Sequence, residues 1–170
     1  PQALLVRLGH RLQLLTGGAR DLPERQRTLR GAIEWSHNLL DAGEQVLFRR
    51  LAIFVGGGGL EAAEAICDAA DDAPLDVLEG IVSLIDKSLL RQVDRPDGEP
   101  GFLMLETIRE YGLEQLAESG EAEAIARAHA AYYLTLAEEA GPHLMGADLR
   151  VWLDRLEAEH RNLRAALDWT

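Results

Sequence analysis

The sequence predicts a mainly α-helical chain: a winged-helix domain with a small β-hairpin wing, followed by a region of long helices. An apolar content of 47% with only 5% aromatic residues favours helices packed on helices. Apolar residues recur at helical spacing along most of the chain. The exception is "SLLRQVDRPDGEPGFLML", in which two short apolar runs flank Pro-Asp-Gly and Pro-Gly. This pattern is typical of a β-hairpin with a longer loop.

Five helices are expected before the hairpin, over residues 4–15, 23–40, 41–54, 60–67 and 75–89. Glycines end the first helix, while Pro23 and Pro74 stand where helices begin. Asp41 and Glu44 have the spacing of a capping box for the third. Helices followed by a hairpin follow the order of a winged helix, and so small a sheet must pack on the helices.

After the hairpin, residues 106–119 predict a helix that Gly120 caps, and long Ala-rich helices follow. The predicted buried stripe of the next helix is Ile125, His129, Tyr133, Leu136 and Ala140, and Gly141-Pro142 is expected to end that helix. A second stripe follows through Leu149, Trp152, Leu153, Leu156, Leu163 and Leu167. The change of composition places a domain boundary near Gly120.

Four glycines at residues 56–59 raise the question of a phosphate-binding loop, because such loops use glycine amides to hold an anion. Leu60, Glu61, Ala62 and Ala63 follow, so the Lys and the hydroxyl of a phosphate loop are missing. Glu61 at the helix start would repel a phosphate. The run is therefore interpreted as a flexible turn between helices.

The formal net charge of −12 argues against nucleic acid and anionic lipid as partners, unless basic residues gather on one face. The helix before the wing, which enters the major groove in DNA-binding relatives, carries Asp76, Glu79 and Asp86 against Lys87. The wing carries Arg91 and Arg95 against Asp94, Asp97 and Glu99. Both candidate DNA surfaces are net negative, which disfavours direct DNA reading.

One basic cluster, "ARDLPERQRTLR", contains Arg20, Arg25, Arg27 and Arg30 against Asp21 and Glu24. It is either a docking surface for an acidic partner or a phosphate, or an ordinary solvated helix face. The second interpretation is the simpler one.

No enzyme motif is found, and no catalytic residue or resident metal is expected in this chain. Glu157 and His160 have the i, i+3 spacing of a di-metal carboxylate helix, but that site needs a second such pair and two further glutamates. The other histidines have no partner at metal-ligand spacing. Cys67 cannot form an internal disulfide, and we expect a small buried side chain in a reducing cytoplasm.

Four segments together resemble a known family: "RTLRGAIEWSHNLLDAGEQVLFRRLAIF", "SLIDKSLLR", "FLMLETIREYGLEQL" and "LEAEHRNLRAALDW". They are similar to the region after the nucleotide-binding core in bacterial NB-ARC-type signal-transduction ATPases (STAND ATPases), which include LuxR-type and antibiotic-biosynthesis transcriptional regulators. The resemblance covers nearly the whole chain in the family's order. It implies a linker helix at residues 1–22, a winged helix at 23–120 and the start of a TPR-like superhelical region at 121–170.

The resemblance also implies that ADP or ATP, with Mg²⁺, binds in a domain upstream of this chain, and that this chain itself holds no cofactor. A Met-His-Asp motif senses the nucleotide in that family. Met104, Leu105 and Glu106 occupy its place, so Leu105 replaces the phosphate-contacting His and Glu106 keeps the acidic position.

The leading functional hypothesis is a regulatory module that couples an upstream ATPase to a helical sensor, with that ATPase and the downstream repeats as partners and self-association possible on activation. The alternatives are a winged helix that binds DNA directly and a helical protein-interaction module. The chain opens without Met and closes inside an apolar period, so it is expected to be part of a longer protein. With no leader and no long apolar run, a cytoplasmic location is expected.

Overall fold

The computed structural model describes residues 29–68 and 75–169, and in them the chain is mainly helical with one small sheet. The predicted helix at 4–15 and the residues Arg20, Arg25 and Arg27 lie outside these ranges. The elements of the first half are α4 (Leu29–Asn38), α5 (Ala42–Leu51), β1 (Gly58–Gly59), α6 (Leu60–Cys67) and α7 (Val77–Asp86). Those of the second half are β2 (Arg91–Asp94), β3 (Pro100–Leu103), α8 (Glu106–Ser119), α9 (Ala122–His143) and α10 (Leu149–Trp169).

Helices α5 to α7 and the sheet form a winged helix, so the predicted fold class is confirmed. The sheet is antiparallel in the order β1-β3-β2, and β2 and β3 are the arms of the wing. Its core side chains include Leu47, Phe48, Leu51, Phe54, Ile66, Leu84 and Phe102, all at most 2% exposed. Burying so many large apolar side chains supplies the main stabilising term for the domain.

The glycine run is more than the flexible turn that the sequence predicts. Gly56 and Gly57 make the turn with φ of 80° and 91°, but Gly58 and Gly59 form strand β1, paired with Phe102 and Gly101 of β3. A Cβ on Gly58 would lie 2.7 Å from Cδ1 of Phe54, so glycine lets the strand lie directly on the aromatic core. Pairing with a strand some forty residues away is not encoded in a local pattern, which is why the sequence missed it.

Local signals placed several helix ends correctly. Asp41 Oδ1 accepts from the Glu44 amide at 2.8 Å, and Glu44 Oε2 accepts from the Asp41 amide at 2.9 Å, which completes the predicted capping box. Gly120 closes α8 in the left-handed conformation, with φ of 80°. The strands differ from the predicted apolar runs because Leu89, Leu90 and Met104 are buried beside the ladder rather than in it.

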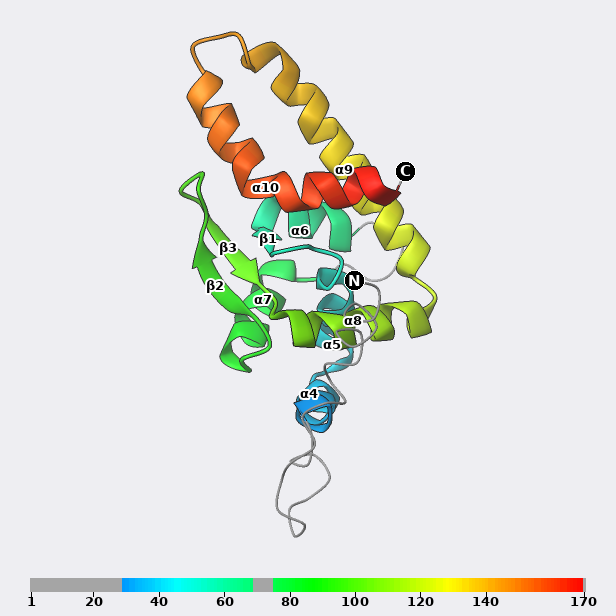
Figure 1. Cartoon of the computed structure of the whole chain (residues 1–170). Helices are drawn as coiled ribbons and strands as arrows, with labels where there is room; N and C mark the ends of the chain where they lie inside the picture. The colour runs from blue at the N-terminus through cyan, green and yellow to red at the C-terminus, as the bar shows by residue number, and fades with distance from the viewer. Residues whose placement is uncertain (1–28, 69–74, 170) are drawn as a thin grey trace, which may run out of the picture.

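Helices α9 and α10 form an antiparallel hairpin that lies over α6 and β1 (Figure 1). The predicted α9 stripe is confirmed, since all five of its residues are buried. The predicted stop at Gly141-Pro142 is wrong, because α9 continues to His143. Proline there removes only one amide donor close to the helix end, where the ladder is ending anyway.

The predicted α10 stripe is wrong in part. Leu149, Leu153 and Leu167 are exposed, and the buried positions are Glu159, Asn162 and Ala166. Glu159 and Asn162 meet polar groups of the wing and the glycine turn. Ala166 is part of the apolar core, and the partly buried Trp152 and Leu163 of the predicted stripe pack against that core. Among the described residues, no helix combines the length and the apolar character needed to cross a bilayer.

Candidate functional site

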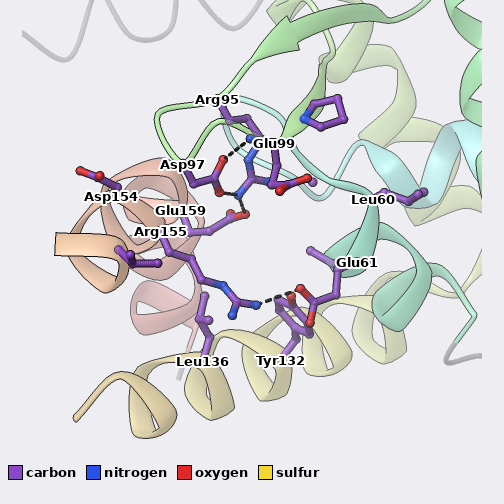
Figure 2. A pocket seen from close by; sticks show the side chains of 14 residues that line it. Leu60, Glu61, Arg95, Asp97, Glu99, Tyr132, Leu136, Asp154, Arg155 and Glu159 are labelled. Atoms are coloured by element: carbon purple, nitrogen blue, oxygen red, sulfur yellow. Dashed lines mark hydrogen bonds and ion pairs between the residues drawn. The ribbon is translucent and has the colours of Figure 1, made fainter. Parts of the chain in front are cut away.

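The most developed polar site lies where the wing meets α10. Arg95 stands in the loop between β2 and β3, and its Nη2 lies 2.8 Å from Oδ2 of Asp97 and 2.7 Å from Oε1 of Glu159 (Figure 2). The side chains of Arg95 and Glu159 are only 12% and 5% exposed. Burial opposes the charged form of Arg95, but the two carboxylates outweigh it and raise the pKa of the guanidinium. The wing arginine is therefore held by the helical hairpin.

The Arg95 side chain crosses the sheet over two glycines, whose lack of a Cβ leaves space for it. Gly59 and Gly101 face each other on adjacent strands. A Cβ on Gly101 would lie 2.5 Å from Cδ of Arg95, and a Cβ on Gly59 would collide with its Nη1. The last glycine of the run therefore leaves room for an arginine side chain, not for a phosphate.

Glu159 joins this ion pair to a second set of buried hydrogen bonds. Its Oε2 accepts from the Tyr133 hydroxyl at 2.7 Å and from Nδ2 of Asn162 at 3.0 Å. Burial, reinforced by the Glu159 carboxylate, raises the pKa of Tyr133, so the phenol stays protonated as the donor. These contacts connect α9 to α10.

Asn162 ties the same network to the glycine turn. Its Oδ1 accepts from the Val55 amide at 2.7 Å, and its Nδ2 donates to the Gly57 carbonyl at 2.8 Å. The Asn162 side chain thus provides hydrogen-bond partners for the Val55 amide and the Gly57 carbonyl, two backbone groups that precede strand β1. Hydrogen bonds among Tyr133, Glu159, Asn162 and the glycine turn fix the arrangement of the elements that they join.

A surface pocket of about 500 Å³ lies beside this network, between the wing, α6, α9 and α10 (Figure 2). Tyr132 and Leu136 of α9 line it, and Arg155 of α10 contacts Glu61 at 2.9 Å. Both arginines of the pocket are already paired with carboxylates, so the pocket does not present an unpaired cation to an anionic ligand. Within residues 29–68 and 75–169, no three His, Cys, Asp or Glu side chains come together as a metal site.

A second polar junction lies at the predicted boundary near Gly120. Glu121 accepts from Nε of Arg49 at 2.7 Å and from Nη2 of Arg50 at 2.6 Å, while Nη1 of Arg50 donates to the Cys67 carbonyl at 2.7 Å. Burial would raise the pKa of Glu121, but the two arginines outweigh it and lower that pKa to about 2. Cys67 is buried as expected, and burial raises the pKa of its thiol to about 12.

The three residues at the predicted nucleotide-sensing position lie at the start of α8. Met104 is buried, whereas Leu105 and Glu106 are exposed. Glu106 contacts Arg109 at 3.2 Å, and Arg109 donates through Nε to the Phe54 carbonyl at 2.9 Å, just before the glycine turn. Glu106 thus supports a contact between α8 and that turn.

The structure does not bring the remaining predicted residues into one site. Arg30, the one member of the basic cluster within the described ranges, pairs with Glu114 of α8 at 2.6 Å. Glu157 and His160 are exposed on α10, while their neighbours Glu159 and Asn162 are the buried pair. Periodicity correctly identified Tyr133 as buried, but a Glu and an Asn among exposed positions of α10 gave no local signal.

Comparison with known proteins agrees with the fold. Residues 40–117 match a family model described as a winged helix-turn-helix domain. The chain is 45% identical over 158 residues to a putative HTH-type transcriptional regulator of Mycobacterium tuberculosis and equally to one of Mycobacterium bovis. It is also 36% identical over 126 residues to an uncharacterized protein of M. tuberculosis.

The match to the regulators covers 93% of this chain but only 18% of their length, and the match to the uncharacterized protein covers 74% and 32%. No solved structure matches the chain. The predicted boundaries at residues 22 and 120 remain predictions.

Proposed function

We propose that this chain, with its winged helix-turn-helix domain, is the regulatory module of a multidomain, ATP-dependent transcriptional regulator. In this role it couples the nucleotide state of an upstream domain to a helical sensor region. The similarity to putative HTH-type transcriptional regulators supports a role in transcription, and their far greater length leaves room for the further domains.

The observation that carries the coupling proposal is the buried contact between Arg95 of the wing and Glu159 of α10. In DNA-binding winged helices a basic wing residue is available to the phosphate backbone. In this chain the Arg95 guanidinium of the wing instead pairs with Glu159 of the helical hairpin. A displacement of the winged helix would therefore be transmitted to α10 directly.

The junction at Glu121, just before the start of α9, supports the same proposal. It holds the start of α9 against α5 through two arginines, one of which also contacts α6 through the Cys67 carbonyl. Two separate polar anchors constrain the hairpin more firmly than one, because a single contact leaves rotation free.

The nucleotide itself is assigned to the upstream domain, not to this chain. The glycine run does not fit a phosphate, because a Cβ on Gly57 would collide with the Phe102 carbonyl and the next two glycines are paired in the sheet. No step of nucleotide chemistry is assigned to residues of this chain. The ATPase activity belongs to the whole regulator in this proposal.

The first test of the proposal is the reading frame upstream of Pro1. A GxxxxGK[ST] motif after a predicted strand is expected. In the full-length protein, replacing ADP by ATP should then change hydrogen-exchange protection at the start of α8 and along α10 together. Arg95→Gln should keep the change at α8 and lose it at α10, whereas Arg91→Gln, an exposed arginine of the same wing, should keep both. A reading frame without an upstream nucleotide-binding motif would overturn the proposal.

Glu106 offers a second test, at the nucleotide-sensing position. In the full-length protein, Glu106→Ala or Glu106→Val is expected to loosen the ADP-bound resting state by releasing Arg109 from its contact beside the glycine turn. Basal transcription should rise and ADP retention should fall. The exposed Glu118 on the same helix serves as the control, through Glu118→Ala. Unchanged basal activity and ADP retention in the Glu106 variants would count against this role.

Direct DNA binding is the second candidate function, and the winged helix-turn-helix match favours it. A labelled DNA duplex titrated at physiological salt distinguishes the two. Saturable binding by this chain, lost in Arg91→Gln, would support the DNA-binding function.

A further inference from the structure

Every charged residue in the helix-turn-helix part of this chain is acidic. From residue 51 to residue 86 the sequence contains no Lys, Arg or His, and its charged residues are Glu61, Glu64, Asp68, Asp71, Asp72, Asp76, Glu79 and Asp86. This stretch includes α6 and α7, the two helices that place a winged helix on DNA. A surface of that sign repels a phosphate backbone and attracts a basic partner.

The helix in the position of a recognition helix also exposes apolar side chains. Leu78 and Val82 of α7 are 54% and 50% exposed, and their i, i+4 spacing puts them on one face. Val77, Ile81 and Leu84 on the other face are buried in the core. The outer face of α7 therefore has an apolar centre, and Glu79 and Asp86 lie beside it.

The orientation of this face is fixed by contacts at both ends of α7. The Asp76 side chain caps the helix by accepting from the Glu79 amide at 2.9 Å. At the other end, Lys87 pairs with Glu44 of α5, which also accepts from the hydroxyl of Ser83. The cation nearest to the end of α7 is thus partly neutralised, and the outer face keeps its negative sign.

We propose that the outer face of α7, with Leu78 and Val82 at its centre and Glu79 and Asp86 at its edge, is a docking site for a basic protein surface. The partner presents arginine or lysine side chains around an apolar pocket that receives Leu78. Complementary charge sets the register and excludes acidic surfaces and DNA, while burial of Leu78 and Val82 supplies affinity. This inference deepens the proposed function, since it gives the chemistry of the surface on which the regulatory module docks.

A site-specific cross-link tests the proposal. Leu78 is replaced by the photo-reactive amino acid p-benzoyl-phenylalanine in the full-length protein, and the same probe replaces Glu138 on α9 as the control position. After illumination in cells, the residues joined to position 78 are identified by mass spectrometry. We expect a protein segment with more arginine and lysine than acidic residues, absent from the position-138 sample.

Charge reversal then decides whether the contact is the proposed one. Glu79→Lys combined with Asp86→Lys should lower the cross-link yield at least about tenfold. Replacing the partner's cross-linked arginine or lysine by Glu should restore it. Both residues are exposed, so the fold should persist, and the effect of added salt on the unreversed protein provides a second measurement that needs no charge variant.

A cross-link to DNA, a cross-link to a neutral or acidic surface, no cross-link, or a yield unaffected by charge reversal and by salt would each overturn the docking proposal. None of these outcomes alters the expected exchange changes in α8 and α10. If the exchange changes in α8 and α10 were observed but no cross-link to a basic segment was found, the proposed function would still hold. Only the docking role of the outer face of α7 would be rejected.

Discussion

Two separate features of the structure require glycine at position 57: its backbone conformation and its close packing against β3. Its φ is 91°, and a Cβ there would collide with the carbonyl oxygen of Phe102. Gly98, at the tip of the wing, has a similar φ of 84°, but nothing lies within 4 Å of a Cβ built on it. The pair therefore separates the cost of a left-handed backbone from the cost of a steric clash.

Gly98→Ala is expected to lower the free energy of unfolding by about 1 kcal/mol, the conformational term alone. Gly57→Ala should lower it by about 3 kcal/mol or more, because β1 must also move away from β3. Urea unfolding of both variants measures the difference. Equal losses would mean that the glycine turn relaxes without disturbing the strand pair.

The carboxylate of Glu121 should make stability depend on pH. Its pKa in the folded protein is about 2, below the ordinary value of 4.5, so its ionised form contributes stability that is present above that ordinary value and lost as the pH falls toward 2. Glu121→Gln should lower the free energy of unfolding by roughly 3 kcal/mol at neutral pH, since two arginines lose the carboxylate that pairs with both of them. The difference from the unmodified protein should shrink steadily below pH 4.5.

Glu123→Gln is the matched control, because Glu123 pairs with Arg127 on the same helix at the exposed surface. Exposed pairs contribute at most about 1 kcal/mol, so this variant should differ little from the unmodified protein at any pH. Guanidinium or thermal unfolding across the pH range measures both variants. A Glu121→Gln difference that stays constant from neutral to acid pH would contradict the assignment.

At the scale of elements, the sequence predicted the helix ends and buried stripes that depend on residues close together in the chain. It missed the features that depend on contacts between residues far apart in the chain. The capping box at Asp41, the glycine end of α8 and the buried stripe of α9 all follow from residues within a few positions of one another. Strand β1 exists only because β3 pairs with it, and the polar face of α10 exists only because the glycine turn and Arg95 approach it. Neither partner is visible in a window of helical length.

Replacing Asn162 tests how much the polar face of α10 contributes to the free energy of unfolding. Asn162→Ala leaves the Val55 amide and the Gly57 carbonyl without their side-chain partner, and each such buried group costs about 1–3 kcal/mol. We expect a loss of roughly 3 kcal/mol and faster hydrogen exchange of the Val55 amide. His160→Ala, two residues earlier and exposed, should change stability by no more than about 0.5 kcal/mol. Unchanged exchange at Val55 would show that water replaces the side chain.

At the scale of the whole molecule, the winged helix and the helical hairpin share one core. The buried cluster runs from Ile33 and Leu47 in the winged-helix half to Ile125 and Tyr133 in α9, without interruption at Gly120. His129 of α9 contacts the ring of Phe54, with centroids 5.8 Å apart. Gly120 ends α8 just before α9 begins, and the buried cluster continues across this point.

This continuity predicts a single unfolding transition, which the three tryptophans can test. Trp35 on α4 reports on the winged-helix half, and Trp152 and Trp169 report on α10. One variant keeps Trp35 alone and another keeps the two α10 tryptophans, with Phe at the other positions. The fluorescence midpoints of the two are expected to coincide.

Arg95→Gln should lower both midpoints together, because the loss of the guanidinium leaves Glu159 buried beside Asp97 without its cation, at a cost of roughly 3–5 kcal/mol. Arg91→Gln on the neighbouring strand removes an exposed charge and should leave both midpoints within experimental error. If Arg95→Gln lowered only the α10 midpoint, the hairpin would unfold independently of the winged helix. The Arg95–Glu159 contact would then be a local attachment, and displacement of the winged helix would not be passed on as the coupling proposal requires.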